Sequence, residues 1–284
     1  MAARCRSGWP TCNPVEWGGH PAEGAVRAMG TNAIPTLLKW ISYQRSSAEG
    51  TSQTGPTGPA SDANHSPTLT PEERARRALY AFRFLGAMAR PAIPQLTQLT
   101  RSSSDADRAD RCAESLAAIG PEAIPSLLSL ATNGPPLTRW YVVAALEFFA
   151  LDPAVVPAVP VLIECLGDTN ENARISEEAG TVLGLIHPPA VVVPALTNAL
   201  RSPAAHMRRQ AAWCLAAFEG EAGSVVPAFR AAMRDPDYQV RVTATNILRR
   251  MGGWELVGEQ WVRRHGTNTL HGITPDFFTN VPSR

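Results

Sequence analysis

One phrase of sequence recurs along the chain and limits what it can fold into. CAESLAAIGPEAIPSLLSL from Cys112 is echoed by AVRAMGTNAIPTLLKWI from Ala25 and by AFRFLGAMARPAIPQLTQL from Ala81. Aligned copies share a proline after an apolar residue, and these anchor prolines are Pro35, Pro94, Pro125, Pro160, Pro194 and Pro227. The gaps between them are 59, 31, 35, 34 and 33 residues. A period of about 30 to 45 residues indicates stacked supersecondary units.

Each copy predicts a helix, a corner and a second helix. Apolar residues three apart share one face of the first helix, as do Leu116 and Ile119. The corner glycine of GTNAIP and GPEAIP suits a left-handed helix end, and the anchor proline fits the first turn of the next helix. Two and six residues after the proline come apolar residues such as Leu162 and Leu166. Because a lone hairpin cannot bury both faces, we expect an all-α, right-handed α-solenoid of about six to seven helical hairpins.

The units resemble HEAT repeats, especially the short bacterial variety named after phycobilisome lyase subunits. DPDYQVRVTATNIL, residues 235–248, is similar to that family's first-helix pattern, an acidic residue followed by V-R-x-x-A-x-x-x-L. Arg139, Arg208 and Arg241 share this frame, each seven residues before a leucine. The resemblance implies that these arginines reach the preceding inter-repeat corner and tie neighbouring units together.

The fifth unit departs from this frame. Seven residues before Leu183 stands Ser176, and the nearest arginine, Arg174, is two residues out of frame. The resemblance covers roughly residues 24–251 apart from one insertion, and it is specific for the fold rather than for chemistry.

The repeat divides the chain into five parts. They are an irregular N-terminal segment (1–23), a first HEAT-like unit (24–43), a disordered Ser/Gly/Pro/Thr-rich insertion (44–69), the repeat array (70–251), and a C-terminal capping helix with a loose tail (252–284). The insertion is a plain spacer or, alternatively, a regulatory or partner-binding loop.

Two sequence signals mark the ends of the array. Thr70, Pro71 and Glu73 carry the pattern of a capping box, which predicts a helix from there to about Met88. After residue 251, Trp254, Val257 and Trp261 would share one face of a helix that covers the last exposed core.

Composition excludes several classes of protein. The formal net charge is +1, so no bulk field would attract nucleic acid or an anionic membrane. No stretch has the roughly 20 apolar residues of a membrane span, and the N-terminus has no apolar run of signal-peptide length. The five cysteines show no recurring spacing, which fits a reducing compartment. We therefore expect a cytoplasmic monomer, with the reservation that a mis-called start would hide an export signal.

The sequence contains no recognised catalytic, cofactor or metal motif. No histidine pairs with Cys, Asp or Glu at a metal-ligand spacing, and Cys5, Cys12 and His20 are separated by seven and eight residues. No phosphate-cradling loop or G-x-S-x-G element is present. Glu177 and Glu178 are adjacent, so on a helix they diverge by about 100°. We expect no enzyme activity and no cofactor.

The second helices are expected to line the concave groove of the solenoid. Their outward positions are one, four and eight residues past each proline, and these are mostly polar and nearly uncharged. Such a surface would bind phosphates poorly but suits hydrogen bonding to a peptide. The candidate partner-binding residues are Lys39, Tyr43, Gln98, Glu164 and Asn198. The expected function is a non-catalytic scaffold for a protein or peptide. A bilin-lyase-type or other HEAT-fold enzyme, which the resemblance permits, and a nucleic-acid-binding solenoid are the alternatives.

Overall fold

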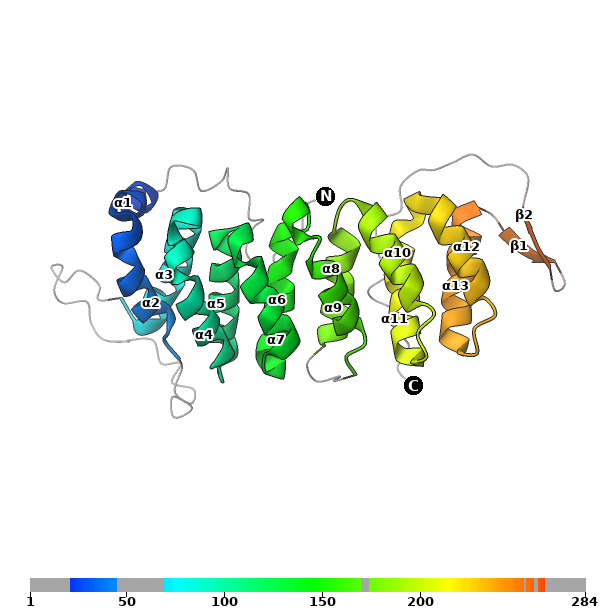
Figure 1. The fold of residues 1–284 in the computed structure, drawn as a ribbon, viewed down its shortest axis with the longest axis horizontal. Coiled ribbons are helices and arrows are strands. Elements are labelled where there is room, and N and C mark those ends of the chain that lie inside the picture. The colour runs from blue at the N-terminus through cyan, green and yellow to red at the C-terminus, as the bar shows by residue number, and fades with distance from the viewer. Residues whose placement is uncertain (1–20, 45–68, 170–173, 253, 258–259, 264–284) are drawn as a thin grey trace, which may run out of the picture.

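The computed structural model describes residues 21–44, 69–169, 174–252, 254–257 and 260–263. This part of the chain forms an α-solenoid in which helical pairs stack side by side along one axis (Figure 1). Six pairs and the first helix of a seventh unit are present in it, which confirms the predicted architecture. The pairs are α1 (Pro21–Met29) with α2 (Ile34–Ile41), α3 (Pro71–Leu85) with α4 (Ile93–Arg101), α5 (Ala106–Ile119) with α6 (Ile124–Asn133), α7 (Pro136–Ala145) with α8 (Ala158–Leu166), α9 (Ile175–Leu185) with α10 (Pro189–Ala199), and α11 (Ala205–Leu215) with α12 (Ala222–Ala232), followed by α13 (Tyr238–Gly252).

Short 3-10 segments build most of the corners within the pairs. They are η1 (Gly30–Ala33), η2 (Gly86–Ala92), η3 (Pro121–Ala123), η4 (Leu146–Phe149), η5 (Pro153–Val155) and η6 (Ala216–Glu221). Gly30 has φ +53° and Gly120 has φ +121°, backbone conformations that favour glycine because a β-carbon would be strained there.

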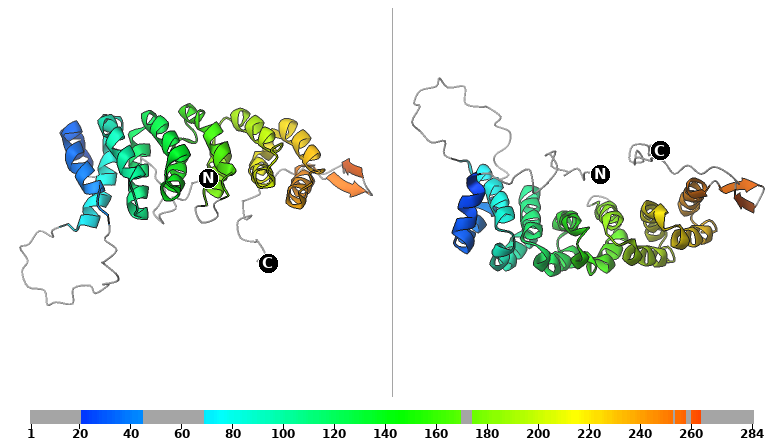
Figure 2. Two further views of the ribbon diagram at one scale, coloured as in Figure 1. Left: turned by 60° about the horizontal axis from the view of Figure 1, so that its bottom comes forward. Right: turned by 90° about the horizontal axis from the view of Figure 1, so that it is seen from above.

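The helices form two layers. The first-helix layer contains α1, α3, α5, α7, α9, α11 and α13, and the second-helix layer contains α2, α4, α6, α8, α10 and α12. The array bends into an arc, with the first-helix layer on the inner side (Figure 2). Neighbouring first helices also contact each other more extensively than neighbouring second helices do, as expected on the inside of a curve.

The predicted apolar stripes form the core between the layers. Leu116, Leu162 and Leu166 are fully buried, and Ile119 is nearly so. The buried residues form one continuous cluster from Ala33 to Leu248, so each pair covers its neighbour and none has a core of its own.

The anchor prolines behave differently at the two ends of the array. Pro35, Pro94 and Pro125 are the second residues of α2, α4 and α6, as predicted. Pro194 and Pro227 instead lie in the interiors of α10 and α12, so the prediction of a first-turn position is wrong for these two. Their helices start earlier, and a proline beyond the first turn removes one backbone hydrogen bond from each.

Several predicted boundaries shift. The capping box of Thr70 and Glu73 is present, but α3 ends at Leu85 because Gly86 turns the chain at φ +51° into η2. Helix α1 already begins at Pro21, inside the segment 1–23 that was expected to be irregular. The predictions for residues 1–20, 45–68 and 264–284 lie outside the described residues.

The predicted C-terminal capping helix is wrong. Residues 254–263 contain β1 (Trp254–Val257) and β2 (Gln260–Arg263), which pair antiparallel with Val257 opposite Gln260. Two sequence signals explain the hairpin: Gly252 and Gly253 disfavour continuing α13, and a Gly-Glu pair separates the strands. The spacing of Trp254, Val257 and Trp261, three and four residues apart, fits one face of a helix but was misleading here.

Candidate interaction surface

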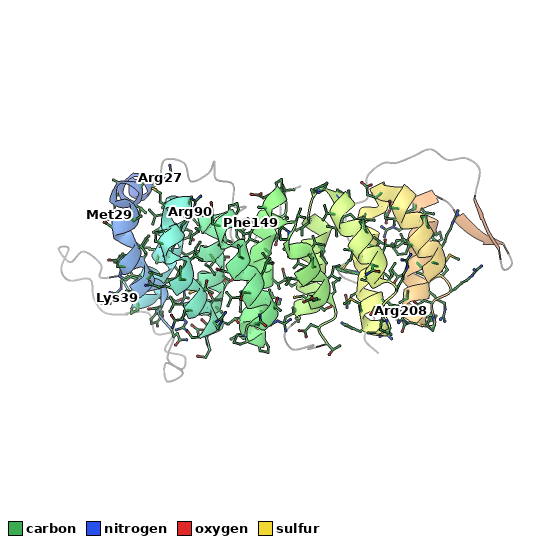
Figure 3. All side chains as sticks on the ribbon, viewed as in Figure 1. Arg27, Met29, Lys39, Arg90, Phe149 and Arg208 are labelled. Carbon is green, nitrogen blue, oxygen red and sulfur yellow. The ribbon has the colours of Figure 1, made fainter. Side chains whose placement is uncertain are left out.

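Arg208 of α11 joins two inter-unit corners. Its Nη1 donates to the carbonyls of Ser202 and Pro203, at 2.9 and 3.0 Å, in the corner before α11. Its Nε and Nη2 donate to the two carboxylate oxygens of Asp235, at 2.8 and 3.0 Å, in the corner after α12. Figure 3 shows Arg208 towards one edge of the array, opposite the edge near which Arg27 and Arg90 lie. The Arg208 side chain is 11% exposed, so little water screens these charge-assisted bonds.

The two other frame arginines make related contacts. Arg139 Nε donates to Ala131 O at 2.7 Å, and its Nη1 donates to Asp168 Oδ2 at 2.8 Å. Arg241 Nη1 donates to Asp235 O at 2.8 Å and to Pro236 O at 2.9 Å. Both arginines therefore donate to the corner before their own helix, as the family resemblance implied, and Arg139 also reaches Asp168 in the corner after α8.

Two units replace the frame arginine. In α9, Ser176 Oγ donates to Leu166 O at 2.8 Å, so a buried hydroxyl serves the corner, while Arg174 forms an exposed pair with Glu177. In α5, Arg108 Nε donates to Ser103 Oγ at 2.8 Å. Sequence reasoning missed Arg108 because Arg108 stands eight residues before Leu116, whereas the other frame arginines stand seven residues before their leucine. Arg108 does keep the distance of six residues from the start of its corner, at Ser102.

The predicted partner-binding residues lie on the outer side of the arc. Lys39, Gln98, Glu164 and Asn198 are exposed residues of α2, α4, α8 and α10, at equivalent positions of the second-helix layer. Because this layer is the outer one (Figure 2), the prediction that it lines the concave side is wrong. An apolar stripe shows which side of a helix is buried, but not which layer the stack bends towards. Partner binding by these residues stays a prediction.

Tyr43 lies at a corner and not along a helix. It follows the end of α2, and its carbonyl oxygen accepts a hydrogen bond of 2.8 Å from Arg111 Nη2. Ser102, Asp168 and Asp235 stand at the same distance from their prolines and also belong to inter-unit corners. This position therefore joins units.

The inner side of the arc carries aromatic and acidic residues. We call the following set, from α3, α5, α7 and η4, the inner-face cluster: Tyr80, Arg83, Asp107, Asp110, Glu114, Trp140, Tyr141 and Phe148. The three helices are successive members of the first-helix layer and pack against each other. Their surface residues therefore form a continuous face.

Arg83 connects the helices of this cluster. Its Nη2 lies 2.9 Å from Glu114 Oε2, and its guanidinium carbon lies 5.9 Å from the ring centroid of Tyr80 and 6.0 Å from that of Phe148. A cation at this distance is attracted to the electron-rich faces of aromatic rings. Phe148 nevertheless remains 46% exposed, so its ring is available for contact.

Trp140 and Tyr141 form an aromatic pair beside the carboxylates of α5. Their ring centroids are 4.7 Å apart at an interplanar angle of 87°, an edge-to-face arrangement. Burial raises the pKa of the Tyr141 hydroxyl, and the negative charges of Asp110, Asp107 and Asp105 raise it further. The pair therefore lies within electrostatic reach of the first half of α5.

Asp110 is the most perturbed carboxyl group of this face. Burial raises its pKa to about 7, and repulsion from Glu114 and Asp107 adds to the effect, while Arg111 and Arg83 oppose it. Burial also raises the pKa of Glu114, against the lowering influence of its partner Arg83. Within the described residues, the Asp110 carboxylate makes no hydrogen bond or ion pair.

Trp213 extends the aromatic surface to α11. A β-carbon on Gly180 of α9 would lie 3.1 Å from Trp213 Cζ3 and 2.8 Å from Cys214 Sγ, so the indole rests close to the α9 backbone. An alanine at this position would force one of these two side chains to shift. The Trp213 side chain is 42% exposed on the same layer as the inner-face cluster.

The described residues contain no group of three or more His, Cys, Asp or Glu placed to hold a metal ion. Burial raises the pKa of Cys112 and of Cys214 to about 12, which suppresses their thiolate forms. Glu177 is exposed while its neighbour Glu178 is buried, so the two carboxylates diverge. None of the described helices combines the length and apolar character needed to cross a membrane.

The register of the first helix relates the aromatic residues of the inner face to the frame arginine. Residues one, two and five positions after it are partly buried or exposed in α7 and α11, and none is fully buried. Trp140 and Tyr141 follow Arg139 directly, and Trp213 stands five residues after Arg208. Large aromatic residues at solvent-facing positions of this register indicate a contact surface.

Comparisons with known proteins agree with this architecture. Residues 159–244 match the family model described as HEAT repeats, whereas a search of curated protein sequences finds no match. The structure of karyopherin Kap121p bound to the extreme C-terminus of the protein phosphatase Cdc14p aligns with 86% of this chain and 30% of its own, at 13% identity and a TM-score of 0.51. The structure of the complex of CpcE and CpcF of phycocyanin lyase from Nostoc sp. PCC7120 aligns with 56% of this chain and 98% of its own, at 18% identity and a TM-score of 0.41.

At these identities the structural likeness concerns the fold alone. The family match falls on the part of the array that contains Arg208, Asp235 and the repeated corners, where the first-helix frame is clearest. Residues 159–244 therefore contain HEAT repeats, and the same frame and stacked helical pairs extend an α-solenoid of similar units over the rest of the described array.

Proposed function

We propose that this solenoid is a non-catalytic scaffold that binds a protein or peptide along the inner side of its first-helix layer. The observation that carries the proposal is the inner-face cluster, which presents aromatic rings and carboxylates together on α3, α5 and α7. Aromatic residues are enriched at the centres of protein interfaces because they bury a large area at a small cost in side-chain entropy.

The exposure of the rings supports this reading. Phe148 and Trp213 are 46% and 42% exposed, although both belong to the inner side of a continuous helical layer. Covering such rings with a partner would remove apolar surface from water, which is the main favourable term in most protein associations.

The fold class supports a binding role as well. HEAT and armadillo solenoids are known for protein binding, and Kap121p, which shares this fold, was solved with a protein C-terminus bound. Burial raises the pKa of the Cys112 and Cys214 thiols to about 12, so neither forms the thiolate that a cysteine nucleophile needs, and this favours binding over catalysis.

Affinity capture from a lysate of the native host, read by mass spectrometry, tests the proposal. The inner-face variant carries Phe148→Ala and Trp213→Ala. The matched outer variant carries Gln98→Ala and Glu164→Ala on the second-helix layer. Both are checked for wild-type helicity by circular dichroism.

The expected result is a partner that the wild type and the outer variant recover and the inner-face variant loses. The reverse pattern would move the binding site to the outer row of Gln98 and Glu164 and overturn the proposal. Equal recovery by all three proteins would exclude both faces.

A further inference from the structure

We infer that the inner-face cluster recognises a basic segment of the partner, with an arginine or lysine cation at Asp107 and Asp110 and its aliphatic stem against Trp140 and Tyr141. The inference rests on the proposed function, since it names the chemistry of the partner that the same face would bind.

The charge balance of the cluster is the first argument. Its three carboxylates are Asp107, Asp110 and Glu114, and its one cation, Arg83, is paired with Glu114. In the part of the chain that the structure describes, neither Asp107 nor Asp110 forms an ion pair. The face therefore carries a surplus of negative charge beside its aromatic rings.

The two arginines next in sequence do not neutralise this surplus by contact. Arg108 donates to Ser103 Oγ at 2.8 Å and to Leu99 O at 3.2 Å, within the corner before α5. Arg111 donates to Tyr43 O at 2.8 Å, on the first unit. Both guanidinium groups are therefore engaged in holding units together.

The position of Asp110 in its helix is the second argument. Asp107 lies in the first turn of α5, where the helix N-terminus stabilises a negative charge, and this alone explains an acidic residue there. Asp110 lies beyond the first turn, where that effect has faded, and it is half-buried with Asp107 and Glu114 three and four residues away on the same helix face. A carboxylate in such surroundings is stabilised by a cation from a partner.

The third argument is that the cluster already accommodates one guanidinium in this way. Arg83 lies near the rings of Tyr80 and Phe148 and pairs with Glu114 at 2.9 Å. Asp110 with the aromatic pair Trp140–Tyr141 offers the same combination of groups one turn earlier along α5. Arg and Lys side chains fit it because their stems pack on rings while their charges meet carboxylates.

The test is fluorescence anisotropy of the full chain with a fluorescein-labelled octapeptide of alternating arginine and glycine. A glutamate–glycine octapeptide is the charge control. The variants are Asp107→Asn with Asp110→Asn, and Tyr141→Leu. Glu164→Gln removes one negative charge from the outer layer and is the matched control.

We expect saturable binding of the arginine peptide only. The double Asp variant should raise its Kd about tenfold and Tyr141→Leu about threefold, because charge pairs and ring contacts both contribute. Glu164→Gln should change the Kd by less than about twofold, because an exposed charge outside the site acts only through screened long-range attraction.

Two outcomes would overturn the inference: no saturable binding to the wild type, or equal binding by the wild type and the double Asp variant. Either could occur while the lysate partner is still lost with Phe148→Ala and Trp213→Ala. The inner-face scaffold would then stand, and only the basic character of the partner would be wrong.

Discussion

Arg208 and Asp235 join two consecutive units through a bidentate pair, with both carboxylate oxygens within 3.0 Å of the guanidinium. The same guanidinium also donates to the carbonyls of Ser202 and Pro203 in the corner before its helix. One side chain therefore connects the two corners on either side of its own unit. Local breaks in such a ladder should weaken the whole array, because each interface depends on the next.

Removing this connection should destabilise the protein. Arg208→Ala leaves the nearly buried Asp235 carboxylate without its cation, and we expect a loss of ~2–4 kcal/mol in the free energy of unfolding. Urea denaturation followed by circular dichroism measures the loss. Arg209→Ala is the control, because Arg209 is 49% exposed and its partner Asp237 keeps hydrogen bonds from the backbone amides of Gln239 and Val240. Equal shifts of the two midpoints would contradict a special role for Arg208.

Two glycines of α9 should respond oppositely to alanine. A β-carbon at Gly180 would lie 2.8 Å from Cys214 Sγ, so Gly180→Ala should destabilise the protein by ~1–3 kcal/mol through overpacking. At Gly184 the nearest atom would be Ala217 Cβ at 3.6 Å, an ordinary contact. Gly184→Ala should therefore stabilise the helix by up to ~1 kcal/mol. Thermal unfolding of both variants measures the difference, and a stabilised Gly180→Ala would show that Trp213 does not need the close approach.

The buried charge of Asp110 should make stability depend on pH. Its pKa rises from 3.8 to about 7 on folding, so the folded state binds more protons between these values and stability falls as pH rises through them. Burial, Glu114 and Asp107 cause the shift, and Arg111 and Arg83 limit it.

Asp110→Asn removes this penalty. We expect the variant to be more stable than the wild type by ~1–3 kcal/mol at pH 8 and nearly equal to it at pH 4, where Asp110 is protonated in the fold. Melting temperatures across this range provide the measurement. An equal gain in stability at pH 4 and pH 8 would show that packing, and not charge, causes the effect. Glu164→Gln on the exposed outer layer is the control and should not change stability at either pH.

The helical cysteines should be protected from alkylation. Burial raises the pKa of Cys112, Cys165 and Cys214, with Cys112 and Cys214 reaching about 12, so few thiolates form at pH 8. Iodoacetamide followed by peptide mass spectrometry should leave these three unmodified in the native protein and modify them in guanidinium chloride. Rapid native labelling of Cys112 would show that α5 opens locally.

Local patterns in the sequence determined the units and their internal order. The stripe of Leu162 and Leu166, the positive φ of Gly30 and the capping box at Thr70 each depend on residues a few positions apart, so their spacing predicts them. The frame that placed Arg208 at a corner is local in the same sense, since corner and arginine are six residues apart. A periodic chain repeats these short-range rules, which is why the solenoid follows from the sequence.

Only the tertiary structure decided which layer faces inward and what that layer carries. Curvature is the sum of small differences in packing between successive helices, and no single repeat encodes it, so Gln98 and Glu164 were assigned to the wrong side. Asp110 and Tyr141 are 31 residues apart in the sequence, and only the packing of α5 against α7 brings them within electrostatic reach of each other. The sequence determines how residues are spaced along each helix. The surface that several helices share depends on how each helix is oriented relative to the next, and the packing between the helices sets that orientation.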